Sequence, residues 1–186
     1  MVNIETLGDI ATLRESSEVE CKLAQGRDGK GKLPEDIWES YSAFANTDGG
    51  DILLGLRELD DETYQLAGIE NTQKVIDELW QGLNNKAITN SNLIPKNWIK
   101  VVTIMGKNII HILVPKAPPQ QKPIYISTDP LRGTYVRLGS ADMQQDAITV
   151  SCLLAAQSQI IEAQVEGSIK GSFYSLYTGK LGCLWI

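Results

Sequence analysis

The sequence predicts an α+β domain in which a mixed sheet of about five to six strands packs against two to three helices. Segments with apolar residues at helical spacing are interspersed with short strand-like runs. Two of these runs lie close together in sequence and are expected to be joined by a two-residue turn, which is typical of an antiparallel hairpin. The 186 residues suffice for one well-buried core and are too few for two typical domains. We therefore divide the chain into a domain over residues 1–165 and a tail of unknown role over residues 166–186.

The first half of the chain carries five local patterns, in this order: a short helix over 4–13, a strand over 19–23, a helix from Pro34 to about 46–50, and strands over 51–56 and 63–66. In the first strand, Glu20 and Lys22 alternate with apolar residues, so we expect both to point to one face, away from the core. Gly49 and Gly50 permit a tight reversal after the second helix.

The second half carries six further patterns: a helix over 72–83, strands over 98–104, 108–114, 124–126 and 134–138, and a helix over 147–165. Gly106 and Lys107 are the expected hairpin turn between the first two of these strands. The proline-rich segment 115–123 cannot lie inside a sheet. No pattern ties residues 167–186 to the core.

The composition indicates a cytoplasmic protein. No run of about 18 apolar residues is present, and residues 1–9 are mixed and acidic, so we expect neither a membrane span nor a secretory signal. Cys21, Cys152 and Cys183 are odd in number and lack metal-ligand spacing, which is typical of a reducing compartment. A structural zinc or a disulfide framework is not expected.

Charge is unevenly distributed along the chain. Residues 1–85 hold 7 basic and 18 acidic residues, whereas residues 86–137 hold 8 basic residues against Asp129 alone. If the two parts occupy different faces, the basic part could hold phosphates despite the net charge of −6. The alternative is that folding interleaves the charges.

An acidic cluster near the N-terminus is the first candidate site. Glu15, Glu18 and Glu20 lie close together in sequence, and Glu58 or Asp51 could add a carboxylate from another strand. Such a set can bind a hard divalent cation such as Mg²⁺ or Mn²⁺, which would activate water for phosphoryl transfer. Clustered acids are also typical of a solvated surface.

A glycine-rich loop and a single histidine are further candidates. The loop over residues 25–33 lacks the spacing and the hydroxyl of a P-loop. Arg27, Lys30 and Lys32 could still contact phosphate there, and the alternative is a mobile surface loop. His111 lies between two isoleucines in an expected strand and is interpreted as structural.

Three further segments follow one another along the chain: Glu-Ser-Ser-Glu-Val-Glu-Cys-Lys at 15–22, Ala-Phe-Ala-Asn-Thr-Asp-Gly-Gly at 43–50 with the following Leu-Leu-Gly, and Tyr-Val-Arg-Leu-Gly-Ser at 135–140. In this order and spacing they resemble the AlbA-like nucleic-acid-binding domain of the Schlafen family and of bacterial regulators. The resemblance implies the mixed-sheet core of that family. It also implies a nucleic-acid path that includes Lys22, Arg137 and the basic stretch 86–137.

In ribonuclease members of that family, three acids form a metal-dependent site. The resemblance carries these roles onto Glu15, Glu20 and Glu58, with Lys22 offsetting charge in the transition state. The residues expected to contact nucleic acid are Lys22, Arg27, Lys30, Lys32, Lys116, Lys122, Arg132 and Arg137. Proteins that resemble this fold often pair, so a homo-oligomer is also expected.

Three functions remain open from the sequence. The first is a nucleic-acid-binding module, for RNA or DNA, of a transcriptional regulator or defence-type protein. The second is a ribonuclease that uses Mg²⁺ or Mn²⁺ at the three acids. The third is an assembly module that binds no nucleic acid.

Overall fold

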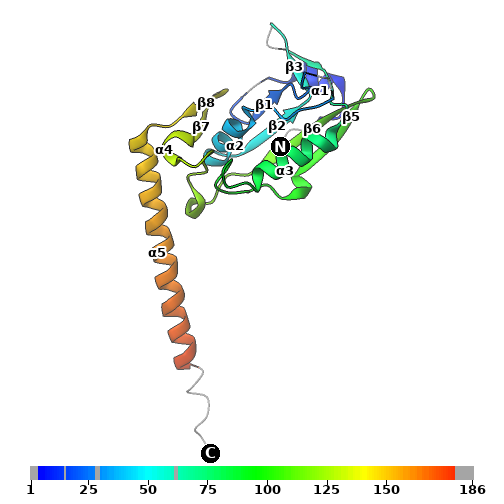
Figure 1. Ribbon diagram of the computed structural model, residues 1–186. Helices are drawn as coiled ribbons and strands as arrows, with labels where there is room; N and C mark the ends of the chain where they lie inside the picture. The colour runs from blue at the N-terminus through cyan, green and yellow to red at the C-terminus, as the bar shows by residue number, and fades with distance from the viewer. Residues whose placement is uncertain (1–3, 15, 28–29, 61–62, 179–186) are drawn as a thin grey trace, which may run out of the picture.

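A four-stranded mixed sheet forms the centre of the domain (Figure 1). The computed structural model describes residues 4–14, 16–27, 30–60 and 63–178, with side chains described as far as residue 166. The strand order is β1 (Val19–Lys22), β2 (Gly50–Leu54), β6 (Lys107–Val114) and β5 (Ile99–Ile104). β1 is parallel to β2, and the other two pairs are antiparallel. The α+β class and the mixed sheet are as predicted.

The remaining strands form two small hairpins instead of extending the main sheet. One pairs β3 (Leu56–Glu58) with β4 (Tyr64–Leu66), and the other pairs β7 (Tyr135–Leu138) with β8 (Ala141–Gln144). The sequence did not indicate β8. The strand expected over 124–126 is reduced to two isolated bridges, in which Tyr125 and Ile126 each pair with one residue.

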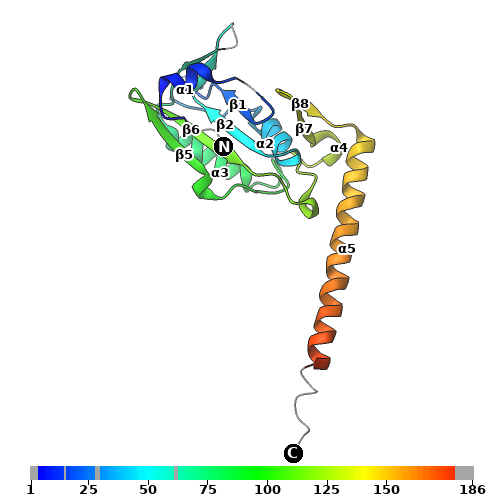
Figure 2. The same cartoon turned by 180° about the vertical axis from the view of Figure 1, so that it is seen from behind.

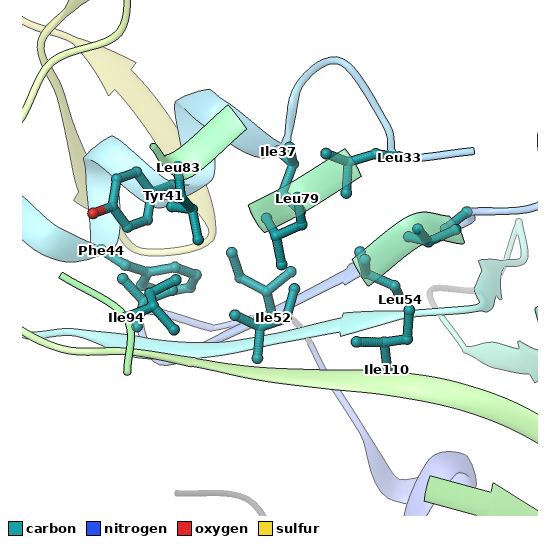
Figure 3. Packing of buried hydrophobic residues seen from close by; sticks show 14 of the residues in the cluster. Leu33, Ile37, Tyr41, Phe44, Ile52, Leu54, Leu79, Leu83, Ile94 and Ile110 are labelled. Atoms are coloured by element: carbon teal, nitrogen blue, oxygen red, sulfur yellow. The ribbon is translucent and has the colours of Figure 1, made fainter. Parts of the chain in front are cut away.

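Helices cover one face of the sheet. α2 (Ile37–Asn46) and α3 (Thr72–Leu83) pack their predicted apolar stripes against Ile52, Leu54 and Ile110 (Figure 3). α1 (Leu7–Thr12) and the β3–β4 hairpin cover the other face, where Leu53 and Ile109 are buried. Because both faces are covered, the central strands β2 and β6 read as nearly continuous apolar runs.

The turn between β5 and β6 is shifted by one residue from the prediction. β5 ends at Ile104 and β6 begins at Lys107, so the two turn residues are Met105 and Gly106. Both have positive φ, 49° and 75°. Two positive φ angles are typical of the tight turn whose twist matches that of a hairpin. Met105 was not expected in the turn, and a methionine with positive φ is uncommon.

The C-terminal helix α5 (Ala147–Thr178) projects away from the domain (Figures 1 and 2). It follows the short helix α4 (Pro130–Gly133) and the β7–β8 hairpin, and it contacts η2 (Pro119–Gln121). A further short helix, η1 (Lys96–Trp98), precedes β5. α5 continues 13 residues beyond the end predicted at Val165, and residues 179–186 of the expected tail lie outside the described residues. None of the described helices has the length and apolar character needed to span a membrane.

Candidate nucleic-acid interface

The guanidinium of Arg137, on β7, is enclosed by the domain. Its side chain is 1% exposed, and Nη1 lies 2.8 Å from Oε2 of Glu20 on β1 and 2.7 Å from Oδ1 of Asp142 on β8. The guanidinium carbon lies 5.0 Å from the ring centroid of Phe44 on α2. Arg137 therefore connects the edge strand of the main sheet, the β7–β8 hairpin and α2.

Backbone carbonyl groups complete the surroundings of Arg137. Nε and Nη2 donate to the carbonyl oxygen of Ser16 at 3.1 and 2.9 Å, and Nη2 also donates to that of Val19 at 3.1 Å. Burial by itself would lower the pKa of Arg137, but the carboxylates of Asp142 and Glu20 outweigh it and hold the pKa above its ordinary value. Arg137 was expected along a nucleic-acid path; the structure places its side chain in the interior, 1% exposed, where β7 packs against α2, and a contact with nucleic acid stays a prediction.

The three motifs that carry the family resemblance meet at this network. Asn46 donates to the carbonyl oxygens of Ile124 at 2.7 Å and Tyr135 at 2.9 Å, and its Oδ1 accepts from the backbone N–H of Ile124 at 2.8 Å. At Gly50, a Cβ atom would lie 2.4 Å from the ring of Phe44. The asparagine and this glycine are thus explained by packing and by hydrogen bonding of buried backbone.

Glu20 and Lys22 lie on the same face of β1, as predicted, but this is the helix-covered face. They are in register with Ile52 and Leu54 of β2, and each side chain is only 10% exposed. Lys22 Nζ lies 2.9 Å from Glu20 Oε1 and 2.7 Å from Oδ2 of Asp36, next to α2. Burial opposes the charge, yet the two carboxylates raise the pKa of Lys22. The expectation that both side chains point away from the core was wrong, because the alternation of β1 does not reveal which face α2 covers.

Of the three acids in the expected metal site, two lie in the described part of the chain. Glu15 lies outside the described residues. Glu20 contacts Lys22 and Arg137, and Glu58 is exposed at the end of β3 in the separate hairpin. Within the described parts of the chain, no group of three or more histidine, cysteine or acidic residues could hold a metal ion. Asp51, the alternative third acid, is 1% exposed and lies 2.6 Å from Nε2 of His111.

Exposed cations gather instead beside the loop between β1 and α2. Gly26, Arg27, Lys32 and Lys74 line an open hollow of about 500 Å³, which we call the basic hollow. Arg27, Lys32 and Lys74 are exposed. Lys30, also exposed, lies in the same loop. The sequence indicated that this loop could contact phosphate although it lacks the features of a P-loop. The structure adds a cation from α3.

Lys74 is the member of the basic hollow that sequence reasoning missed. It lies in the first turns of α3, and its Nζ donates to the carbonyl oxygen of Gly31 at 2.9 Å. Its carboxylate neighbour Glu78 is 4.0 Å away and receives the backbone N–H of Leu33 at 2.9 Å. The sequence shows only a Lys–Glu pair four residues apart on a helix. Only the packing of α3 against the loop brings Lys74 to Arg27 and Lys32.

A second hollow adjoins the basic hollow and shares two of its residues, Gly26 and Lys32. Its walls include Leu23, Leu33 and Pro34 together with the acidic residues Glu35 and Asp36, and Leu23 is 41% exposed. Cationic and apolar surfaces therefore lie next to each other on this part of the domain.

The basic stretch 86–137 does not converge on one groove. Lys107 adjoins the β5–β6 turn and Arg132 lies in α4, and these elements lie at opposite ends of the domain (Figure 1). Arg132 lies 3.7 Å from Asp129, and Lys116 lies 2.8 Å from Asp48. The basic residues are therefore clustered in the sequence but not in space. The reason is that the stretch 86–137 passes through both ends of the domain.

Lys122 stabilises the end of α2. Its Nζ donates to the carbonyl oxygens of Asn46 and Thr47, which are among the last carbonyls of the helix. Burial, together with repulsion from Lys116, lowers the pKa of Lys122. Lys122 is therefore a helix-capping residue in this structure.

Comparisons with known proteins agree on the fold. The family model described as Schlafen, AlbA_2 matches residues 15–146. The N-terminal domain of a RecG-related protein from Nitrosomonas europaea is 28% identical with a TM-score of 0.53, over 75% of this chain and 90% of that chain. The DIP2311 protein from Corynebacterium diphtheriae is 21% identical with a TM-score of 0.50, over 76% of this chain and 24% of that chain, a similarity of fold alone. No curated protein matches the chain.

Proposed function

Because the chain belongs to the Schlafen AlbA_2 family, we propose that it is a nucleic-acid-binding module of a transcriptional regulator or defence-type protein. Polynucleotide phosphates occupy the basic hollow in this proposal. The observation that carries it is the convergence of Arg27, Lys32 and Lys74 from two separate elements on one open surface. Lysine and arginine bind a polyanion by displacing its counterions. The similar N-terminal domain from Nitrosomonas europaea belongs to a protein related to the DNA helicase RecG, which supports a nucleic-acid partner.

The apolar part of the adjoining hollow favours a single-stranded partner. Leu23 and Pro34 offer apolar surface next to Lys32, so an unpaired base can lie against them while its phosphate lies among the cations. A base in a duplex is stacked between its neighbours and cannot do this. We therefore expect binding of single-stranded DNA and of the loops of transfer RNA to exceed binding of duplex DNA.

Fluorescence anisotropy tests this function. Labelled transfer RNA, single-stranded DNA and duplex DNA are titrated with the full chain at several salt concentrations between about 50 and 200 mM. Replacing Arg27, Lys32 and Lys74 with glutamine should weaken binding at least tenfold and reduce the slope of log affinity against log salt by about 2, since each phosphate contact contributes about 0.7 to 0.9.

The matched control removes the same positive charge elsewhere. Lys86, Lys96 and Lys100 are exposed and lie outside the basic hollow. Replacing these three with glutamine should change affinity by less than about threefold, because only long-range attraction is lost. Equal losses in the two triple variants would mean that net charge, and not the basic hollow, governs binding.

Two rival functions are outcomes of the same experiment. A ribonuclease using Glu15, Glu20 and Glu58 would cleave the RNA when Mg²⁺ or Mn²⁺ is added, and Glu20→Gln would abolish the cleavage. In the structure Glu20 already pairs with Lys22 and Arg137, an arrangement that does not favour this rival. No binding of any probe at the lowest salt would leave an assembly module as the function.

A further inference from the structure

α5 lies beyond the part of the chain that the family shares. The family match ends at residue 146, and α5 begins at Ala147. Its first turns are attached to the domain: Val150 is buried, and Gln157 Nε2 donates to the carbonyl oxygen of Gln120 at 3.0 Å. After these turns the helix leaves the domain in both views (Figures 1 and 2). Its 32 residues correspond to a length of about 48 Å.

The projecting part of α5 exposes apolar side chains of the kind that a helix usually packs against a partner. Ile161 and Val165 lie four residues apart on one face and are 44% and 53% exposed, and Leu154 lies seven residues before Ile161 on the same side. Between residues 147 and 166 the only charged residues are Glu162 and Glu166. Helix-stabilising ion pairs four residues apart are therefore impossible in this segment. Since helices gain most of their stability from packing of an apolar face, this one needs a partner.

Exposed apolar side chains also gather where α5 begins. Among residues with described side chains, eleven large apolar ones are exposed, and six of these belong to the last third of the described chain: Leu131, Leu138, Met143, Ile148, Ile161 and Val165. They lie on α4, the β7–β8 hairpin and α5, and large exposed apolar patches are typical of interaction surfaces.

We propose that α5 pairs with α5 of a second copy of this chain about a two-fold axis. A second copy presents the same apolar side chains, Leu154, Ile161 and Val165, to this face, and Glu162 and Glu166 can remain at the edge of the contact. The lack of Lys and Arg between residues 147 and 166 also makes it unsuited to an anionic lipid surface or a polynucleotide. The part of α5 beyond Gln157 is about 32 Å long, so a strip about 10 Å wide along it covers about 320 Å² per copy. Two copies thus bury on the order of 600 Å², the size of a weak and reversible interface.

Light scattering coupled to size-exclusion chromatography tests this pairing on the full chain. We expect a dimer that dissociates on dilution. Replacing Ile161 and Val165 together with glutamate places four like charges in the dimer interface and should give a monomer at every concentration. Met105→Glu is the control, since Met105 is 79% exposed at the β5–β6 turn, far from α5; it should remain a dimer.

Other outcomes would overturn the proposal. A wild-type chain that stays monomeric up to about 1 mM has no such interface, because even a contact with a dissociation constant of about 1 mM would populate the dimer at that concentration. A double variant that stays dimeric places the contact elsewhere. A monomeric wild-type chain that co-sediments with neutral phosphatidylcholine vesicles would identify a lipid surface as the occupant. Near-ultraviolet circular dichroism of the tryptophans checks that the double variant keeps the folded domain.

Discussion

The network around Arg137 and the basic hollow are built from the same kinds of residues, yet they are suited to different tasks. Arg137 has two carboxylates and two carbonyl oxygens within hydrogen-bonding distance or ion-pair contact and is 1% exposed. In the hollow, Lys32 is 59% exposed and its partner Glu35 is 90% exposed. Burial and pairing with buried carboxylates, and not the type of residue, therefore decide whether a cation stabilises the fold or stays exposed to solvent.

The largest effect should come from removing the buried cation. Arg137→Met should lower the free energy of unfolding by about 3 to 5 kcal/mol, because two carboxylates would then have only Lys22 as a nearby cation inside the domain. Urea denaturation measures this change. Adding Glu20→Gln to Arg137→Met should restore part of the loss, because one of the two carboxylates that lost Arg137 is then neutral. A single variant within about 0.5 kcal/mol of wild type would show that the network does not stabilise the domain.

Lys22 should have an intermediate effect that depends on pH. Lys22→Met should cost about 2 kcal/mol near neutral pH, since hydrogen bonds to Glu20 and Asp36 are lost. The pKa of Lys22 is raised in the folded state, so its contribution is fully present below the unfolded value of 10.5 and is lost as pH rises through the folded value.

The pH profile of that difference is the measurement. The difference in unfolding free energy between wild type and Lys22→Met should stay constant from about pH 6 to 9 and shrink above the unfolded pKa. A difference that grows with pH in the alkaline range would contradict the ion pairs seen at Lys22.

The smallest effect should come from the exposed pair in the basic hollow. Glu35 lies 3.1 Å from Lys32 and competes with an incoming phosphate for it. Glu35→Gln should leave stability within about 0.5 kcal/mol of wild type and tighten polynucleotide binding about two- to threefold at low salt. The same anisotropy titration measures it, and weaker binding of this variant would place the phosphate away from Lys32.

Local patterns predicted most helices and strands, because each depends on neighbours in sequence. The apolar stripes of α2 and α3 and the alternation of β1 follow from periodicities of 3.6 and 2 residues. The same reasoning missed β8 and ended α5 too early, at Val165. β8 is paired only with β7 and is mostly exposed, so it lacks the alternation that marks a half-buried strand. Glycines at 167 and 171 lower helix propensity, which explains the early end predicted for α5.

The candidate site was predicted only in part. The loop with Arg27, Lys30 and Lys32 was identified from its composition, whereas Lys74 looked like an ordinary surface residue of a helix. Arg137 was expected at a ligand because its motif resembles that of nucleic-acid-binding relatives. In the structure the motif lies at a joint between β1, α2 and β8, where Glu20 and Asp142 pair with Arg137 and the ring of Phe44 lies against its guanidinium.

The sequence alone determined the α+β class, the family and the order of the main helices and strands, because these depend on short-range periodicity and on motifs. Only the tertiary structure decided which cations are enclosed and which face solvent. A charge is compensated by groups that are near it in space, and chain contacts as distant as Arg137 and Ser16 or Lys74 and Gly31 have no signature in local spacing.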